Sequence, residues 1–303
     1  MSAALIIDDL TLIHPGGGGI RDVSFTAQDR GVTAIIGANG AGKTVLFTLI
    51  AGLASPQSGA IRFPRAGATV AYCPDVPQFE GWLTATEVVT TSVHTASTRG
   101  TRANAARQAR DALDACGLAA VSHRRVADFS RGMLQRLGIA AALVTDPDIL
   151  ILDEPNSALD PIGRADVREL ILDQRQQRCI LLSSHLLSEV EALADHVITL
   201  DQGRVVAQGR PSELLGAGLE PVWTIRLTDP AELDLAELAA RVPQARFESD
   251  GSEMCHVRFE SFVAARDHLL AAVLALGTPV IEVTLRDRDL DAAFARLVRT
   301  VNV

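Results

Sequence analysis

The sequence lacks any apolar run long enough to cross a lipid bilayer, which takes about 18 to 20 consecutive apolar residues. The best candidate, 269–276, is short and is followed by Gly277 and Pro279. Residues 1–12 also lack the basic start, apolar centre and small-residue cleavage site of a secretory signal peptide. If this protein acts at a membrane, we therefore expect another chain to cross it.

Cysteine is also scarce, and no two cysteines have the spacing of a metal-binding pair. The four cysteines are Cys73, Cys116, Cys179 and Cys255. Because they lie far apart in the sequence, they predict reduced and mostly buried thiols of a cytosolic protein rather than disulfides or a zinc site.

Basic residues do not outnumber acidic ones, since the net charge is -9 at pH 7. A protein that holds nucleic acid through its phosphates normally presents a basic surface, so we expect no nucleic-acid partner. The chain is long and rich in apolar residues: it has 303 residues, of which 48% are hydrophobic and 21% charged. These values predict one large and one small domain with a sizeable buried core rather than a disordered chain.

The first part of the chain has the order of strand, glycine loop and helix that opens a nucleotide-binding α/β unit. Two strands are predicted at 5–12 and 20–26, and the glycine run 16–19 between them is predicted to be a turn because no helix follows it. A short β-branched run at 32–36 predicts a buried strand, and apolar residues at helical spacing follow at 45–50.

The middle of the chain continues the α/β pattern. Helical spacing and many alanines at 87–118 predict a mostly helical insertion. The apolar runs 149–152 and 179–182 predict buried strands, each followed by polar residues and a helix, so the sheet is expected to be mixed with a parallel centre. Two further runs on either side of a Gln-Gly turn, 197–200 and 204–207, predict a hairpin.

After a short helix near 211–215 and a linker, the pattern restarts with the order β-α-β-β-α-β of a ferredoxin-like fold. The predicted elements are 222–227, 233–240, 245–247, 255–259, 261–276 and 279–285, followed by a terminal helix at 290–298. We therefore expect a first domain at 1–215, with a helical subdomain at about 76–146, and a small α+β accessory domain at 216–303.

Residues 37–44, Gly-Ala-Asn-Gly-Ala-Gly-Lys-Thr, fit the phosphate-loop pattern G-x-x-x-x-G-K-[ST]. Glycines let backbone N–H groups converge on phosphates, and the helix N-terminus that follows adds a partial positive charge. Lys43 would reach the β- and γ-phosphates, and Thr44 would place its hydroxyl on Mg²⁺. The alternative is a chance glycine turn, which the flanking strand and helix disfavour. The residues expected to bind the nucleotide here are Gly37, Asn39, Gly40, Ala41, Gly42, Lys43, Thr44 and Val45.

Two carboxylates, Asp153 and Glu154, end the apolar strand predicted at 149–152. The carboxyl ends of strands face the ligand crevice of an open α/β sheet, so Asp153 is expected to hold Mg²⁺. Glu154 is placed to orient or deprotonate the water that attacks the γ-phosphate. Two acids after a strand are often only the start of a solvated loop, but the phosphate loop earlier in the chain favours the catalytic interpretation.

Between these two motifs, residues 129–136 read Phe-Ser-Arg-Gly-Met-Leu-Gln-Arg. The segment resembles the signature loop of ABC ATPases, and the order of phosphate loop, signature and acidic strand end is similar to that family over about residues 3–210. The resemblance implies a P-loop NTPase fold with a mixed sheet core and a helical subdomain, which binds and hydrolyses ATP with Mg²⁺. It also implies a dimer, because Ser130 and Gly132 match positions that bind the γ-phosphate held by a second subunit.

The resemblance implies further roles along the chain. Residues 157–160, Ser-Ala-Leu-Asp, resemble the loop that crosses the dimer seam, and His185 resembles the switch histidine that contacts the γ-phosphate. Residues 286–294 resemble the end of the small C-terminal domain of ATPases from ABC-2-type exporters of drugs and polysaccharides. The alternative for this domain is a regulatory or merely stabilising appendage of another origin.

Three positions depart from the family pattern. Val45 stands where a Ser or Thr usually touches the α-phosphate. Asp75 stands where the family has a glutamine, and Gln78 is a substitute if the loop shifts. Asp75 is expected to hold Mg²⁺ directly and also to add negative charge beside the γ-phosphate. His14 falls near the position of the aromatic residue that stacks on adenine. Because the phosphate loop and the acidic pair are intact, we still expect ATP hydrolysis.

Together these features predict the ATP-binding and hydrolysing subunit of an ABC-2-type exporter, cytoplasmic and peripheral on the inner face of the cell membrane. The partners implied are a separately encoded transmembrane permease and a second ATPase subunit, either an identical copy or a paralogue. Phe79, Trp82 and Leu83 are expected either to dock the permease or to pack locally. The alternatives are a soluble ABC ATPase of another class and a nucleotide-binding regulatory subunit with little turnover, the latter favoured by Asp75 and Val45.

Overall fold

The fold is that of a computed structural model of the 303-residue chain. The structure describes residues 2–96, 102–185, 187–217, 220–228, 233–249 and 251–285. The chain divides into two compact units, 1–214 and 215–303. Within the described residues, no helix is long and apolar enough to span a membrane.

The first unit is built on a six-stranded sheet with the order β5-β6-β7-β3-β8-β9. Its strands are β3 (Gly31–Ile36), β5 (Val70–Cys73), β6 (Ile149–Leu152), β7 (Cys179–Ser183), β8 (His196–Asp201) and β9 (Arg204–Gly209). All are parallel to their neighbours except β9, which forms an antiparallel hairpin with β8. β6 and β7 are buried along their whole length, as apolar strands covered on both faces are. The predicted mixed sheet with a parallel centre is confirmed.

A second sheet in this unit has three antiparallel strands in the order β2-β1-β4. They are β1 (Ala3–Ile13), β2 (Gly19–Gln28) and β4 (Ser58–Arg62). The glycine run between β1 and β2 forms a turn, as predicted, and a Cβ on Gly19 would lie 2.0 Å from the carbonyl oxygen of Leu12. Neither β4 nor β5 was predicted. Both strands are short, and β4 begins with Ser-Gly, so neither has the periodicity of a longer strand.

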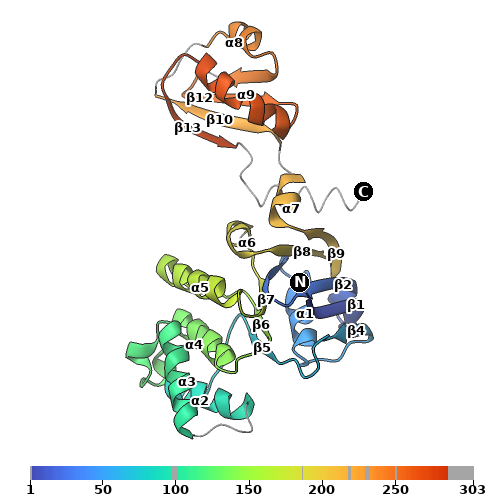
Figure 1. Ribbon diagram of the computed structural model, residues 1–303, viewed down its shortest axis with the longest axis vertical. Coiled ribbons are helices and arrows are strands. Elements are labelled where there is room, and N and C mark those ends of the chain that lie inside the picture. The colour runs from blue at the N-terminus through green and yellow to red at the C-terminus, as the bar shows by residue number, and fades with distance from the viewer. Residues whose placement is uncertain are drawn as a thin grey trace. The chain divides into compact units, whose positions relative to one another are not determined.

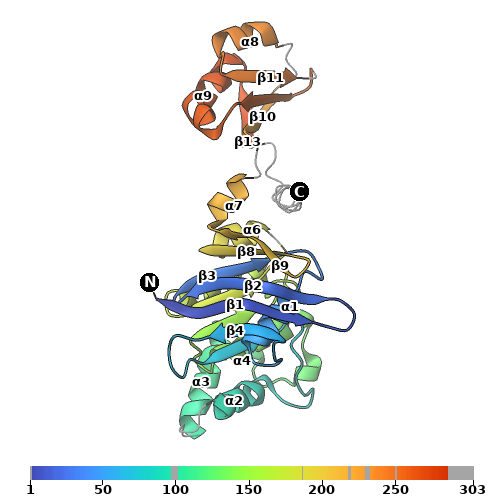
Figure 2. The same cartoon turned by 90° about the vertical axis from the view of Figure 1, so that its right-hand side faces the viewer.

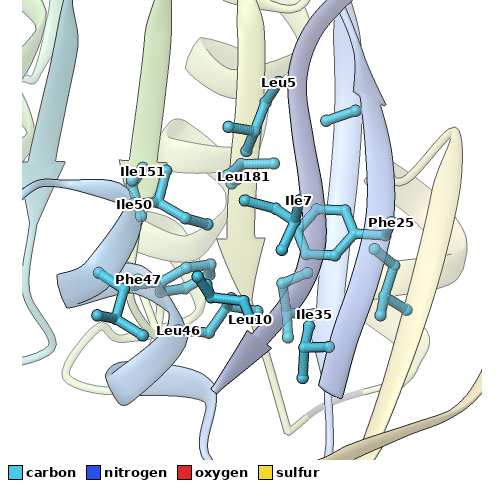
Figure 3. Close-up of a cluster of buried hydrophobic side chains, with 14 of the residues drawn as sticks. Leu5, Ile7, Leu10, Phe25, Ile35, Leu46, Phe47, Ile50, Ile151 and Leu181 are labelled. Atoms are coloured by element: carbon cyan, nitrogen blue, oxygen red, sulfur yellow. The ribbon is translucent and has the colours of Figure 1, made fainter. Parts of the chain in front are cut away.

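The core of the first unit includes residues of both sheets and of α1 (Lys43–Ile50), as Figure 3 shows. Phe47 and Leu46 of α1 are fully buried, in one cluster with Ile7 of β1, Phe25 of β2 and Ile151 of β6. This burial fixes the helix against the sheet. The glycine loop that precedes α1 is therefore held in place at the end of β3 by apolar packing.

Three helices of the first unit pack together as a helical group, green in Figure 1. They are α2 (Ala85–Ala96), α3 (Arg102–Ala115) and α4 (Arg131–Leu143). Short 3₁₀ turns at Ala119–Val121 and Val126–Asp128 lie between α3 and α4. Further helices of this unit are α5 (Pro161–Gln174) and α6 (Leu187–Leu193), and α7 (Pro211–Ala217) begins in it. The helical insertion predicted at 87–118 is confirmed in α2 and α3.

The second unit has the predicted order of elements. They are β10 (Val222–Leu227), α8 (Leu235–Arg241), β11 (Ala245–Ser249), β12 (Met254–Phe259), α9 (Phe262–Ala275) and β13 (Val280–Leu285). The strands are antiparallel in the order β11-β12-β10-β13, as in a ferredoxin-like fold. α8 and α9 pack on one face of this sheet (Figure 2). The segments predicted at 286–294 and 290–298 lie outside the described residues.

All four cysteines are buried, as predicted. Burial raises the pKa of the Cys179 thiol to about 12 and that of the Cys255 thiol to about 11. At neutral pH both thiols stay protonated, so they serve as small apolar side chains in the cores of the two units.

Replacing Phe47 by alanine is expected to lower the free energy of unfolding by about 3 to 5 kcal/mol, because the ring has no exposed surface and its loss leaves a cavity. Urea denaturation followed by circular dichroism measures the change. Leu53→Ala is the control: Leu53 is 68% exposed, so its truncation is expected to change stability by less than about 0.5 kcal/mol. Equal losses in the two variants would contradict this core.

Candidate functional site

The phosphate loop connects β3 to α1, and glycines shape it. Gly42 has a φ of 104°, and a Cβ there would lie 2.6 Å from Ile20 Cγ2. Gly40 also has a positive φ, of 84°. Lys43, the only lysine in the sequence, is 8% exposed and donates from Nζ to the carbonyl oxygen of Gly37 at 2.8 Å. The loop thus combines a helix N-terminus with one fixed ammonium group, and these donors suit a polyphosphate.

Asp153 follows β6 directly, and three hydroxyl groups hold its buried side chain. Ser183 Oγ donates to Asp153 Oδ1 at 2.6 Å. Thr44 Oγ1 and Tyr72 OH donate to the other oxygen, Oδ2, at 2.8 and 3.3 Å. Burial first, and the Asp153 charge second, raise the pKa of Tyr72 above its ordinary value, so the phenol remains a donor. The three donors fix the orientation of the carboxylate beside the hydroxyl of Thr44.

Glu154, the next residue, has a left-handed backbone conformation with a φ of 48°. Its N–H donates to Ser183 Oγ at 2.8 Å. Its carboxylate lies 3.7 Å from Lys43 Nζ and 2.7 Å from His185 Nδ1. The two acids after β6 therefore have different partners: Asp153 accepts from hydroxyl groups, and Glu154 faces the nitrogen atoms of a lysine and a histidine.

One pocket joins the phosphate loop to the acidic strand end. It is lined by His14, Gly18, Gly19, Ala38, Asn39, Gly40, Ala41, Gly42, Lys43, Thr44, Val45, Asp75, Asp153 and Glu154. The structure thus brings together the predicted loop residues 39–45, the acidic pair, His14 and Asp75. Gly37 contributes its carbonyl oxygen to Lys43, and His185 is joined to the pocket through its contact with Glu154.

Asp75 and Gln78, the two candidates for the glutamine position of the family, lie in different places. Asp75 lines the phosphate pocket and accepts a hydrogen bond of 2.5 Å from Ser157 Oγ. Gln78 is exposed and lines a separate groove with Phe79 and Gly138. In this structure Gln78 therefore does not take the place of Asp75.

Ser130 and Gly132 do not line the phosphate pocket but a second hollow of the same unit. Ser130 caps α4 and accepts a hydrogen bond of 3.2 Å from the N–H of Met133. A Cβ on Gly132 would lie 3.2 Å from the carbonyl oxygen of Ala158, so this loop packs against the segment 157–160. A hydroxyl, a glycine and the start of a helix are the features of a second anion site.

A magnesium ion, which the family resemblance implies, fits the oxygens at Asp153 and Thr44. The Thr44 hydroxyl and the Asp153 carboxylate are 2.8 Å apart, and both are hard oxygen ligands. In the part of the chain that the structure describes, no group of three or more His, Cys, Asp or Glu side chains is arranged to hold a metal. Mg²⁺ needs few protein ligands, because it usually keeps several waters and binds substrate phosphates.

Ser183 and Tyr72 both contact Asp153, and neither was predicted as a site residue. Parallel pairing sets Leu152 opposite Leu182, which places Ser183 level with Asp153. A polar residue directly after an apolar strand, beside the strand that ends in two acids, was the signal for Ser183. Tyr72 lies on β5, which has four residues and gave no comparable signal.

The chain is similar to known proteins along most of its length. The sequence pattern of the family described as ABC transporter matches residues 20–157. An uncharacterised ABC transporter ATP-binding protein of Bacillus subtilis (strain 168), YxlF, is 33% identical over 70% of this chain and 73% of that protein. The bacitracin transport ATP-binding protein BcrA of Bacillus licheniformis is 29% identical over 98% of both chains. A solved structure described as the ATP binding subunit of an ABC transporter matches 70% of this chain and 91% of its own, with 30% identity and a TM-score of 0.63.

Replacing Lys43 by alanine is expected to weaken ATP binding about 10- to 100-fold, because charge-assisted hydrogen bonds contribute about 1.5 to 3 kcal/mol. Isothermal titration calorimetry on the full chain measures the affinity. Arg62→Ala removes an exposed cation paired with Asp8 and controls for the change in net charge; it is expected to bind ATP like the parent chain. Unchanged affinity in Lys43→Ala would mean that the phosphates bind elsewhere.

Proposed function

This chain belongs to the ABC transporter family, and from that premise we propose that it powers export through a separately encoded membrane-spanning subunit. As a member of the family, the chain is an ATP-binding subunit with ATPase activity. The observation that carries the proposal is the cluster of Lys43, Asp153, Glu154 and His185 around the phosphate loop. The bacitracin transport ATP-binding protein, which is similar over 98% of this chain, supports a role in transport.

The proposed working form is a dimer. Ser130 and Gly132 line a hollow that is separate from the phosphate pocket of the same chain, so one chain does not place its own signature loop on the triphosphate bound at Lys43. Two chains arranged head to tail would complete both sites, each lending its loop to the other. We take the second chain to be an identical copy, since homodimers with two-fold symmetry are the commonest oligomers.

The residues of the pocket have distinct roles in the proposed hydrolysis. The loop and Lys43 bind the β- and γ-phosphates, and Lys43 exchanges its 3.7 Å contact with Glu154 for a phosphate oxygen. Thr44 and Asp153 would hold Mg²⁺, whose charge offsets that of the phosphates. Glu154, released from Lys43, accepts the proton of the attacking water. His185 orients the Glu154 carboxylate and reaches the γ-phosphate.

Three departures from the family pattern enter this proposal. Asp75 lines the pocket, and we assign it as a further carboxylate that binds the metal directly or through water. His14 lines the same pocket and is assigned to stack on adenine, where an imidazole binds less strongly than a phenol. Val45 also lines it, but its side chain offers no hydroxyl to the α-phosphate.

The proposed docking surface for the permease is the groove beside the loop that follows β5. Phe79 is half-buried and lines this groove, together with the exposed Gln78. Nearby in sequence, Trp82 is 68% exposed, whereas Leu83 is half-buried. Aromatic side chains are enriched at protein interfaces, so an exposed indole three residues after Phe79 suits a protein partner. Docking there would hold the chain at the inner face of the membrane and transmit closure of the dimer to the permease.

Glu154→Gln is expected to abolish ATP turnover and to accumulate an ATP-bound dimer, because the amide keeps the size of the side chain but cannot accept the proton of water. Phosphate release measures turnover, and size-exclusion chromatography with light scattering in the presence of ATP and Mg²⁺ measures the dimer. Glu169→Gln, an exposed change on α5, is the matched control. Wild-type turnover in Glu154→Gln would remove Glu154 from the role of base, and a monomer under all conditions would contradict the shared-site dimer.

Asp75→Gln is expected to raise the Mg²⁺ concentration needed for half-maximal ATP hydrolysis, because it removes one carboxylate from the pocket lining. Turnover is measured across a Mg²⁺ titration at saturating ATP, and binding of Mn²⁺ in the presence of a non-hydrolysable ATP analogue is followed by its paramagnetic resonance. Asp111→Asn on α3, an exposed residue, is the control for the loss of one negative charge. Coincident titration curves for Asp75→Gln and the parent chain would show that Asp75 does not bind the metal.

A further inference from the structure

We propose that Ser183 is a positioning residue that holds Glu154 in the orientation needed for hydrolysis; this inference rests on the proposed role of Glu154 as the base. Ser183 ends β7 and has no exposed surface. Its hydroxyl donates to Asp153 Oδ1 at 2.6 Å and accepts from the N–H of Glu154 at 2.8 Å. The buried Ser183 oxygen therefore links the carboxylate of Asp153, assigned to the metal, to the backbone of Glu154, assigned as the base.

The backbone of Glu154 is where this link matters. With a φ of 48°, Glu154 lies in the left-handed region, which costs a residue with a Cβ roughly 1 to 2 kcal/mol. In a continued strand, successive side chains would point to opposite faces. β6 ends at Leu152, two residues before Glu154, and in this left-handed turn the Glu154 carboxylate reaches Lys43 and His185. The hydrogen bond to Ser183 stabilises the turn.

The direction of the Ser183 hydroxyl is fixed by its neighbours. A hydroxyl has one proton and two lone pairs, and an ionised carboxylate only accepts. The proton of Ser183 therefore points to Asp153, which leaves a lone pair for the Glu154 N–H. Asp153 is also held by Thr44 and Tyr72 through its other oxygen. Loss of the Ser183 hydroxyl consequently affects the orientation of Glu154 more than that of Asp153.

The residues that follow β7 make a second contact with Glu154. Two residues after Ser183, the Nδ1 atom of His185 lies 2.7 Å from Glu154 Oε2. The last residue of β7, Ser183, thus contacts the backbone of Glu154, and His185, two residues later, contacts its carboxylate. A hydroxyl is required at the first of these contacts, because its oxygen is both a donor and an acceptor. Alanine lacks this group, whereas threonine retains it.

The test compares Ser183→Ala with Glu154→Gln in the full chain. Ser183→Ala is expected to lower kcat about 10- to 100-fold, because small misplacement of a catalytic group costs on this scale. Its affinity for ATP is expected to stay within about threefold of the parent value, since the phosphate loop is intact. Slow turnover with intact binding is also expected to accumulate the ATP-bound dimer, as in Glu154→Gln. Ser183→Thr keeps the hydroxyl and is expected to restore most of the turnover and to abolish this accumulation.

Ser184→Ala is the matched control, because it removes the neighbouring buried hydroxyl, which donates to Glu189 Oε2 at 3.0 Å. It is expected to lower kcat less than Ser183→Ala does. If Ser183→Ala hydrolyses ATP at the parent rate while Glu154→Gln traps the dimer, the positioning role is overturned and the proposed function stands. Loss of ATP affinity by more than about tenfold in Ser183→Ala would overturn it too, since the serine would then serve the binding pocket itself. Full turnover in Glu154→Gln would overturn both the assignment of the base and this inference.

Discussion

The parallel register of β6, β7 and β3 is the constraint on which the site depends. Leu152 pairs with Leu182, and Ile35 pairs with Ser183, so the three strands are held at a common level. The carboxyl ends of parallel strands open onto one crevice, and here each end supplies a different chemical group. β3 leads into the phosphate loop, β6 into the acidic pair, and β7 into a serine and a histidine. Side chains from three segments that are far apart in the sequence thereby meet around Asp153 and Glu154.

The parts of this arrangement that are local in sequence were predictable. Each motif of the site lies within a few consecutive residues: the glycines and lysine of the phosphate loop in one segment, and Asp153 with Glu154 in another. A strand or helix predicted beside each motif supported its assignment. The ferredoxin-like order of the second unit was predictable for a similar reason. Its strands are regular enough to show alternation, as in β12, where buried and less buried side chains alternate.

Contacts that depend on pairing between strands were not predictable. Ser183 and Tyr72 meet at Asp153 only because β5, β6 and β7 are neighbours in register. β4 and β5 themselves are too short to show a period, and tertiary pairing rather than propensity makes them strands. The distinction between Asp75 and Gln78 also needed the structure, since both follow the same strand and only the course of the loop places Asp75 in the pocket.

Lys43 gives this chain an unusual chemical property, because all its other basic side chains are arginines or histidines. Acylating reagents and acetylating enzymes act on amines and not on guanidinium groups. Apart from the amino terminus, the sequence therefore offers them a single amine, and that amine belongs to the side chain assigned to the triphosphate. Because this amine is 8% exposed, its acylation should be slow and should become slower still with nucleotide in place, so the extent of acylation would report how fully the pocket is occupied.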